Sequence, residues 1–315
     1  MHKAHKTAFT LFRLSIVIIF IGILVTGVSQ GLEIVYKARL ANARMATTNS
    51  PVQSVNGLRL WLESTLENSF ARGTSSFTDM LNPDNNQAIG RWNDVNFQSN
   101  NPTRNNAIQS TLANQPLFMR NGINQIPALF FDGTDDFIAS TTDTSVLDNF
   151  TIFIVAHPLN PCTINTPSNS AGQTGQRYAI YPQHGDTILP SSNAVGVGLS
   201  LCTNFIATVE HNTNYIPYII SQATTINRPQ QITIKYQNKT PYLYINSTNT
   251  YIGSTGSRLA FAGLSFGGGR ASGFFENYGY FRGYIGEIIL YDNDLDDNDR
   301  KLIENYLIDK WRIKI

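Results

Sequence analysis

Carboxylates gather at two places in this sequence, and each place is a candidate metal site. Asp132, Asp135 and Asp136 surround Gly133, a residue free to adopt the positive φ of a tight turn. The second run extends from Asp292 to Asp299 and lacks the central Gly and the closing Glu of an EF-hand loop. We therefore interpret the first group as a turn and the second as an acidic helix start, where the helix dipole favours negative charge.

Other side chains lack the spacing that catalysis requires. Retaining glycosidases need two carboxylates about 5–5.5 Å apart. The nearest match to a pair on one face of one strand is Glu287 followed by Asp292, and that spacing puts them on opposite faces. Residues 263–267 match the pattern G-x-S-x-G, but a glycine-rich stretch follows in place of a helix, and no His comes after His211. We therefore predict no catalytic residues and no enzymatic activity.

Tryptophans and cysteines are the remaining candidates for binding or stability. Trp92 lies in a loop-like stretch and is the aromatic residue that we expect to contact a ligand. Trp61 and Trp311 sit in apolar patterns and are expected in the core. Cys162 and Cys202 are too few for a disulfide scaffold or a zinc ribbon. A disulfide between them would close a loop of about 40 residues and contribute about 3–4 kcal/mol if the compartment is oxidising.

The composition is that of a folded chain with few charges. Of 315 residues, 42% are hydrophobic, 11% are aromatic and 14% are charged, with a formal net charge of +1. Disordered chains have few aromatic residues and high net charge, so disorder is excluded as the general state. The near-neutral balance also argues against nucleic acid as a partner, because phosphate binding needs a basic face.

Residues 9–28 form an almost uninterrupted apolar segment, FTLFRLSIVIIFIGILVTGV. Twenty residues of helix span about 30 Å, the hydrocarbon thickness of a bilayer. The single charge, Arg13, lies near the start, where its side chain can reach the headgroups. Lys3 and Lys6 precede the segment, which favours a cytoplasmic N-terminus and the rest of the chain beyond the membrane, whereas Lys37, Arg39 and Arg44 on the far side count against this orientation. A cleaved signal peptide is the alternative, although this run is longer and no A-x-A-like site follows closely.

The same helix is expected to continue beyond the membrane as a stalk. Apolar residues recur at helical spacing after the span: Leu32, Val35, Tyr36, Leu40 and Ala43. No helix breaker occurs before Ser50 and Pro51. We therefore predict a continuous helix from about Phe9 to Ala46, within a transmembrane and stalk segment of residues 9–50.

The segment AFTLFRLSIVIIFIGILVTGV resembles the N-terminus of type IV prepilins and type II secretion pseudopilins. Ala8 matches the residue before the cleavage site, Phe9 matches the first mature residue, and Gly22 falls at the internal Gly of the family. The resemblance implies a leader of residues 1–8, cleavage between Ala8 and Phe9 by a prepilin peptidase, and N-methylation of Phe9. It also implies a single-pass protein of the bacterial inner membrane, with its C-terminal domain periplasmic or extracellular.

Arg13 departs from the pattern of this family. The family has an acidic residue here, four places after the new N-terminus, that pairs with the terminal amine of a neighbouring subunit during assembly. A guanidinium repels that amine instead of neutralising it. Processing by the peptidase is therefore expected, whereas Arg13 opposes assembly with pilus or pseudopilus subunits.

Short strand-like segments fill the rest of the chain. They are residues 57–64, 128–133, 150–158, 194–201, 205–212, 215–221, 231–238, 241–247 and 283–292. Many alternate apolar and polar residues, as Gln231 to Tyr236 do, which is typical of strands with one face in a core. No helical pattern recurs between them, so a parallel βαβ fold is disfavoured. The chain ends in one helix capped by Asp296, and we predict a mainly β protein with an antiparallel β-sandwich over residues 55–315.

Three segments of this domain are similar to the laminin-G-like and concanavalin A-like domains of bacterial surface proteins: GLRLWLES (57–64), GRWNDV (90–95) and NQPLFMRNGINQIPALFFDGTDDFI (114–138). The second half agrees, so the resemblance covers nearly all of residues 57–312. It implies a concanavalin A-like jelly roll. Because laminin-G-like domains often bind calcium through Asp and Asn on loops, the resemblance leaves calcium open here without assigned ligands, and no other cofactor is expected.

These observations favour a membrane-anchored, prepilin-like protein that presents a lectin-like β-sandwich for adhesion or glycan binding. A minor pseudopilin of a type II secretion or type IV pilus system is the second hypothesis, favoured by the N-terminus and opposed by Arg13. An exported glycan hydrolase on the same fold is the third, and the missing carboxylate motif counts against it.

Overall fold

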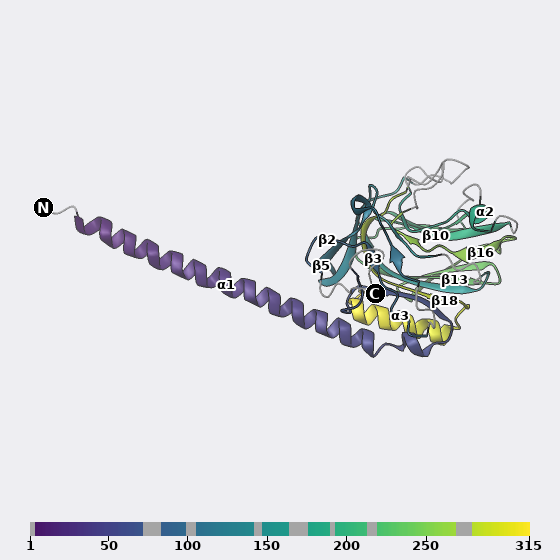
Figure 1. The fold of residues 1–315 in the computed structure, drawn as a ribbon, viewed down its shortest axis with the longest axis horizontal. Helices are drawn as coiled ribbons and strands as arrows, with labels where there is room; N and C mark the ends of the chain where they lie inside the picture. Colours follow the sequence, from purple (N-terminus) through teal and green to yellow (C-terminus); the bar gives the residue numbers. More distant parts are fainter. Residues whose placement is uncertain are drawn as a thin grey trace.

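A long N-terminal helix and a two-sheet β domain make up the structure, a computed structural model (Figure 1). It describes residues 4–71, 83–98, 105–141, 147–163, 176–189, 193–212, 219–268 and 279–315, with the backbone alone for residues 4–12, 29, 186, 187 and 249. The helices are α1 (Ala4–Thr48), η1 (Pro51–Ser54), η2 (Leu112–Asn114), α2 (Gly185–Ile188) and α3 (Asp297–Trp311).

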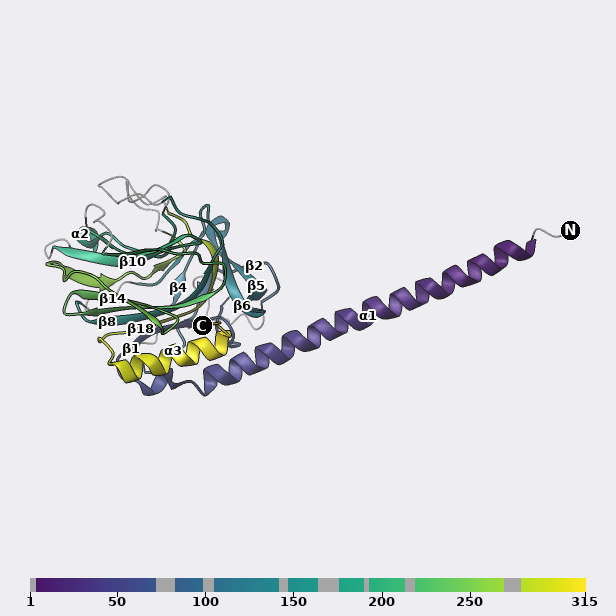
Figure 2. The ribbon, with the colours of Figure 1, turned by 180° about the vertical axis from the view of Figure 1, so that it is seen from behind.

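Helix α1 has 45 residues and projects far beyond the β domain, as Figure 1 and the reverse view in Figure 2 show. At a rise of about 1.5 Å per residue its length is roughly 68 Å. Its apolar side chains from Leu14 to Val28 are exposed, whereas Ala43 and Thr47 near its C-terminal end are buried against the domain. The continuous helix predicted from the apolar run and the stalk pattern is confirmed.

The first β-sheet, sheet A, carries the longer strands. Its strand order is β15-β14-β13-β8-β18-β6-β5-β2, and β1 pairs with β18 beside this path. In chain order the strands are β1 (Leu58–Glu63), β2 (Gln87–Ala88), β5 (Leu117–Ile123), β6 (Ile126–Asp132), β8 (Phe150–Pro158), β13 (Gln230–Gln237), β14 (Thr240–Ile245), β15 (Asn249–Ile252) and β18 (Arg282–Tyr291). All of these pairings are antiparallel.

The second sheet, sheet B, faces sheet A across the core. Its order is β12-β11-β10-β9-β17-β7-β4-β3, and β16 pairs with β10. Its strands are β3 (Arg91–Trp92), β4 (Ala107–Ile108), β7 (Ile138–Ala139), β9 (Tyr178–Tyr181), β10 (Ala194–Cys202), β11 (Phe205–His211), β12 (Ile220–Ala223), β16 (Leu259–Ala262) and β17 (Ser265–Phe266). The β10–β16 pairing is parallel, and the other described pairings of this sheet are antiparallel.

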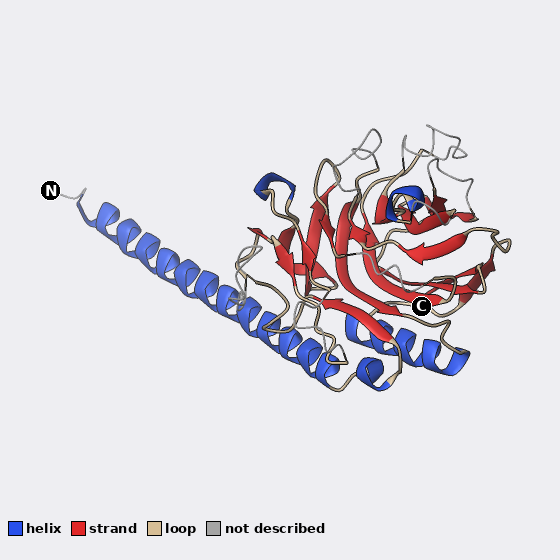
Figure 3. Cartoon of the chain, turned by 45° about the vertical axis from the view of Figure 1, so that its right-hand side comes forward, coloured by secondary structure: helices blue, strands red, loops and turns tan. Residues whose placement is uncertain are grey.

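The predicted β-sandwich is confirmed, and its core lies between the two sheets (Figure 3). Alternate residues of β13 show why the strands form: Ile232, Ile234 and Tyr236 enter the core between the sheets. Of the strand predicted at residues 215–221, residues 220 and 221 belong to β12, and residues 215–218 lie outside the described part of the chain.

Helix α3 covers the outer face of sheet A and builds a second apolar cluster there (Figures 1 and 3). The predicted N-cap is confirmed, because Asp296 Oδ1 accepts hydrogen bonds from the backbone N–H groups of Asn298 (2.8 Å) and Asp299 (2.9 Å). Trp61 and Trp311 lie in this second cluster, as expected. The end of α1 joins the same cluster through Ala43, so the stalk and the sandwich share one packed junction.

Candidate functional site

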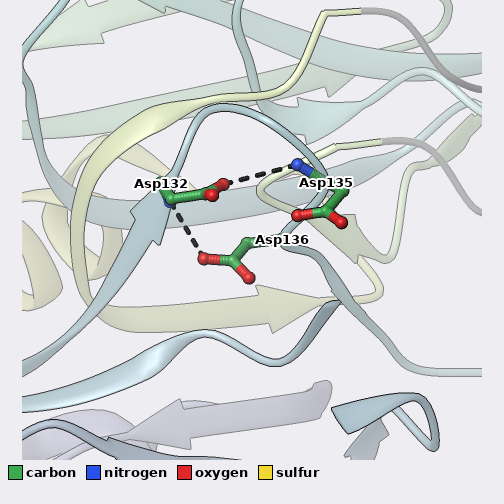
Figure 4. Close-up of side chains that lie close together, drawn as sticks. All are labelled: Asp132, Asp135 and Asp136. Atoms are coloured by element: carbon green, nitrogen blue, oxygen red, sulfur yellow. Dashed lines mark hydrogen bonds between the residues drawn. The ribbon is translucent and has the colours of Figure 1, made fainter. Parts of the chain in front are cut away.

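The acidic turn between β6 and β7 is the part of the described chain that most resembles a ligand site (Figure 4). Asp132 Oδ1 accepts hydrogen bonds from the N–H groups of Thr134 (2.7 Å) and Asp135 (3.4 Å). Asp136 Oδ2 accepts one from the N–H of Asp132 (3.0 Å). Hydrogen bonds between an Asp side chain and a backbone N–H two to four residues away stabilise Asp-rich turns. The turn predicted from the sequence is therefore confirmed.

Gly133 and two arginines fix this turn against the neighbouring strand. Gly133 has a φ of +80°, and a Cβ there would lie 2.6 Å from Arg282 Cβ, so a larger residue would meet both strain and a clash. Arg177 Nη1 donates to the carbonyl oxygens of Tyr280 (3.2 Å) and Gly133 (3.4 Å). The position of the three carboxylates is therefore set by backbone contacts.

The three carboxylates of Asp132, Asp135 and Asp136 can each offer one oxygen, and these oxygens lie within 4.8 Å of one another. Calcium takes six to eight oxygen ligands, so carbonyl or water oxygens would have to complete a site. The donor chemistry of the turn fits a hard cation. The sequence left calcium open without ligands, and these three residues are the ones that would hold it.

Burial makes Asp136 the unusual acid of the group. Its residue is 5% exposed. The pKa of Asp136 is raised from 3.8 to about 7, chiefly by burial; the hydrogen bond from the Asp132 N–H lowers it, and the charges of Asp132 and Asp135 contribute to the rise. A cation among these carboxylates would offset that repulsion and favour the ionised form.

Trp92 is not a ligand-contact residue in this structure, and that prediction is wrong. The side chain is fully buried in the core between the sheets, and its Nε1 donates to the carbonyl oxygen of Glu63 (2.6 Å). Its ring packs beside Phe70, with centroids 6.3 Å apart. The stretch read as a loop contains the two-residue strand β3, which turns the indole inward.

Two carboxylates that the sequence analysis did not pair meet on neighbouring strands. Glu63 of β1 lies opposite Glu287 of β18, and both are fully buried. Lys310 Nζ of α3 contacts Glu287 Oε2 at 2.7 Å and Glu63 Oε2 at 3.2 Å. The indole N–H groups of Trp61 and Trp311 each donate to Glu287 at 2.8 Å.

This buried charge cluster has a structural role. Burial opposes ionisation of Glu63, but Lys310 and hydrogen bonds from Ser69, Thr65 and the Leu66 N–H together lower its pKa. Its carboxylate oxygens accept bonds within the protein and have no exposed surface for a sugar or a water nucleophile. The pair therefore does not form a glycosidase site. No local motif marks it, because Lys310 is 247 residues from Glu63.

Ser265 of the G-x-S-x-G pattern is fully buried in strand β17, and its Oγ donates to the carbonyl oxygen of Gly268 (2.7 Å). It is not followed by a helix in the described residues 265–268. The interpretation of this motif as a glycine-rich strand end is confirmed.

Cys162 and Cys202 form a disulfide, with their Cα atoms 5.5 Å apart. The bridge lies in a small apolar cluster on sheet B that contains Tyr178, Tyr181 and Phe205. It ties the segment after β8 to the end of β10.

The N-terminal processing residues lie on α1. Ala8 and Phe9 fall in its first turns, where the structure describes the backbone alone, and Arg13 follows one turn later with an exposed side chain. Helix α1 is long and apolar enough to cross a membrane, and its most apolar stretch has no buried residue. Ile19 is 60% exposed and Leu24 is 65% exposed.

Comparison with known proteins gives no family assignment. No protein-family model matches the sequence, and no protein with a curated description matches it. Among solved structures, a Trypanosoma rangeli sialidase in complex with sialic acid has a TM-score of 0.46 at 12% identity, covering 81% of this chain and 33% of that chain.

Two other solved structures have lower scores. Domain 4 of AbnA, an extracellular arabinanase from Geobacillus stearothermophilus in complex with arabinotriose, has a TM-score of 0.39 at 12% identity over 60% of this chain and 80% of that chain. The receptor-binding domain of botulinum neurotoxin type G has a TM-score of 0.39 at 15% identity over 64% of this chain and 48% of that chain. This chain thus spans a third of the sialidase, and similarity at this level supports no conclusion about its chemistry.

Proposed function

We propose that this protein is a single-pass membrane protein that holds a β-sandwich on the non-cytoplasmic side of a bacterial inner membrane, where the sandwich binds a surface ligand such as a glycan. The observation that carries the proposal is the exposed apolar part of α1. Leaving one Leu or Ile side chain in water in place of an apolar environment costs about 1.5–3 kcal/mol. A helix with this many exposed apolar residues needs lipid or protein around it.

The disulfide supports the proposed topology independently. Disulfides persist in oxidising compartments and are rare in the cytosol. The Cys162–Cys202 bridge lies in the sandwich, and Lys3 and Lys6 lie at the opposite end of the chain, before the span. Basic residues before a membrane span favour a cytoplasmic N-terminus. Both observations support a sandwich that lies beyond the membrane.

Processing at the N-terminus follows from the resemblance to prepilins. We expect a prepilin peptidase to cleave between Ala8 and Phe9 and the new amine of Phe9 to be methylated. The new N-terminus would then lie four residues from Arg13 on the same helix. The positive charge at this position opposes pairing with the amine of another subunit. We therefore favour a membrane-anchored surface protein over a filament subunit.

Glycan binding is the finer part of the proposal. It rests on the similarity of residues 57–64, 90–95 and 114–138 to laminin-G-like domains and on the two-sheet sandwich that the chain forms. The acidic turn falls within the third of these segments and is the part of the sandwich where a cation could assist binding. A hydrolase role is less favoured, since the one close Glu pair described above is buried beneath α3.

Intact-mass analysis of the protein purified from bacterial membranes tests the processing step. We expect a chain that has lost residues 1–8 and gained one methyl group on Phe9. A chain that still begins at Met1 would contradict processing. Cleavage at a site C-terminal to residue 20 would instead support a cleaved signal peptide. A glycan array probed with the full chain in detergent tests the ligand, with a polysaccharide hydrolysis panel as the control for the enzyme alternative.

A minor pseudopilin remains the second candidate because the first residues of α1 resemble those of pseudopilins. Replacing Arg13 by Glu restores the family pattern at that position. If the chain is itself a minor pseudopilin, it should crosslink to pilus or pseudopilus subunits with Arg13 present. Crosslinking that requires Arg13→Glu would favour the surface-protein role.

A further inference from the structure

Glu210 carries a carboxyl group inside the core between the two sheets. It belongs to β11, is 4% exposed, and lies directly opposite Val197 of β10, which is part of that core. Residues directly opposite on paired strands share one face of a sheet, so the Glu210 side chain points toward sheet A. There its Oε1 accepts a hydrogen bond from Tyr236 Oη of β13 (2.9 Å). This buried acid has no role in the proposed function.

The loop of residues 253–258 covers this carboxyl group. It leads from β15 of sheet A to β16 of sheet B. A Cβ on Gly256 would lie 3.8 Å from Glu210 Oε1 and 4.0 Å from Oε2, so the backbone of the loop passes directly over both oxygens. In Figure 1 β13 and β16 are drawn at the end of the sandwich away from the free part of α1. The covered acid is therefore separate from the stalk junction.

Contacts with the β13–β14 hairpin hold the loop in place. The Gly256 N–H donates to the carbonyl oxygen of Lys239 (3.0 Å). The hydroxyl groups of Thr255 and Thr240 lie 2.7 Å apart and are exposed to solvent. Segments held by solvent-exposed hydrogen bonds open locally at a lower free energy than core strands do. The loop therefore has the contacts of a segment that can open while both sheets stay folded.

Arg258, at the end of the same loop, is a cation whose charge favours the ionised form of Glu210. The two side chains form no ion pair in the described part of the chain, where Arg258 Nε is also buried without a hydrogen-bond partner. Tyr236 is the titratable group that faces Glu210 from β13, and burial together with the Glu210 charge raises the pKa of that phenol well above its usual value. Lys239 of the hairpin lies 3.7 Å from Asp148.

Ionisation of Glu210 is unfavourable while the loop is closed. The pKa of Glu210 is raised above its usual value, chiefly by burial, although the hydrogen bond from Tyr236 and the charge of Arg258 lower it. With the loop open, the carboxyl group meets water and titrates near its ordinary value. Between the two values the closed form holds a proton that the open form has released. Opening therefore becomes more favourable as the pH rises, by up to about tenfold per pH unit.

We propose that residues 253–258 form a proton-controlled lid, which the protonated Glu210 keeps closed over the end of the core and the ionised carboxylate opens to water. Once open, the lid also lets Arg258 turn toward the carboxylate. Because the loop joins sheet A to sheet B, its opening changes the shape of this end of the sandwich with pH. The inference depends on the described sandwich alone and is independent of the membrane topology and of the ligand.

Hydrogen–deuterium exchange of the full chain in detergent from pH 5 to pH 8 tests the proposal, with each rate divided by the intrinsic rate of an unprotected amide at that pH. We expect the protection of residues 253–258 to fall at least fivefold between pH 5 and pH 7 in wild type. Glu210→Gln, which can still accept the Tyr236 hydrogen bond, should keep its protection constant. Glu67→Gln is the matched control, because Glu67 is exposed, and should behave as wild type. Arg258→Gln should extend the loss of protection to higher pH.

Equal protection of the loop at pH 5 and pH 7 in wild type would overturn the proposal, as would the same loss of protection in Glu210→Gln. A parallel loss over the strands β10 and β13 would show unfolding of the whole sandwich in place of a lid and would overturn it too. The wild-type profile decides the question even where a variant fails to fold, because a lid requires a pH-dependent loss confined to the loop.

Discussion

Replacing Asp136 by Asn should remove a pH-dependent loss of stability that the acidic turn builds into the sandwich. The folded pKa of Asp136 is about 7, against an ordinary value of 3.8. Between these values the folded chain binds a proton that the unfolded chain has released, so the stability falls as the pH rises from about 4 to about 7 and is constant above that. The shift is roughly three units, which corresponds to about 4 kcal/mol at full effect.

The substitution keeps the local geometry while removing the charge. An Asn side-chain oxygen can still accept the hydrogen bond that Asp136 Oδ2 receives from the Asp132 N–H at 3.0 Å. We therefore expect Asp136→Asn to match wild type near pH 4 and to exceed its stability at pH 8 by up to about 4 kcal/mol.

Thermal and urea unfolding of the full chain in detergent, followed by tryptophan fluorescence from pH 4 to pH 8, measures this difference. All three tryptophans lie in the sandwich, so the signal reports on that domain. Asp309→Asn is the matched control, because Asp309 is exposed on α3 and away from the turn. A variant with the wild-type pH slope, or one less stable than wild type at pH 8, would refute the electrostatic argument. Adding calcium at pH 8 should stabilise wild type more than the variant if the turn binds that ion.

Three further predictions follow from the buried contacts. Lys310→Met leaves Glu63 and Glu287 buried without their cation and should lower the free energy of unfolding by about 3–5 kcal/mol. The control Lys301→Met, on the exposed side of α3, should change it little. Equal urea midpoints for the two variants would contradict this prediction. The double variant Cys162→Ser and Cys202→Ser opens a loop of 40 residues and should therefore lower the free energy of unfolding by about 3–4 kcal/mol in the same assay. The wild-type protein in reductant is the independent check. Trp92→Phe should lower stability by about 1–3 kcal/mol through the lost bond to the Glu63 carbonyl and leave the binding of any array-identified glycan unchanged; a selective loss of binding would restore Trp92 as a contact residue.

Local patterns in the sequence were enough to predict the elements. Hydropathy located α1, period-two alternation located β13, and the Asp296 cap located the start of α3, because each depends on neighbours within a few residues. The acidic turn was visible for the same reason, since its hydrogen bonds join residues at most four apart.

Contacts between distant segments could not be predicted in this way. The meeting of Glu63, Glu287 and Lys310 depends on the register of β1 against β18 and on the packing of α3 across sheet A. Trp92 was misassigned because a two-residue strand has no detectable period, and only the pairing of β3 with β4 shows which way the indole points.

The central claim is that α1 crosses the membrane and leaves the sandwich on the far side. Reporter fusions after Ile315 test it most directly, with alkaline phosphatase and a cytosol-restricted fluorescent protein expressed in parallel and the membrane fraction collected for each. We predict an active phosphatase, a dark fluorescent fusion and a chain that requires detergent for release. A bright fluorescent fusion with inactive phosphatase, or a full chain recovered in the soluble fraction, would contradict the claim.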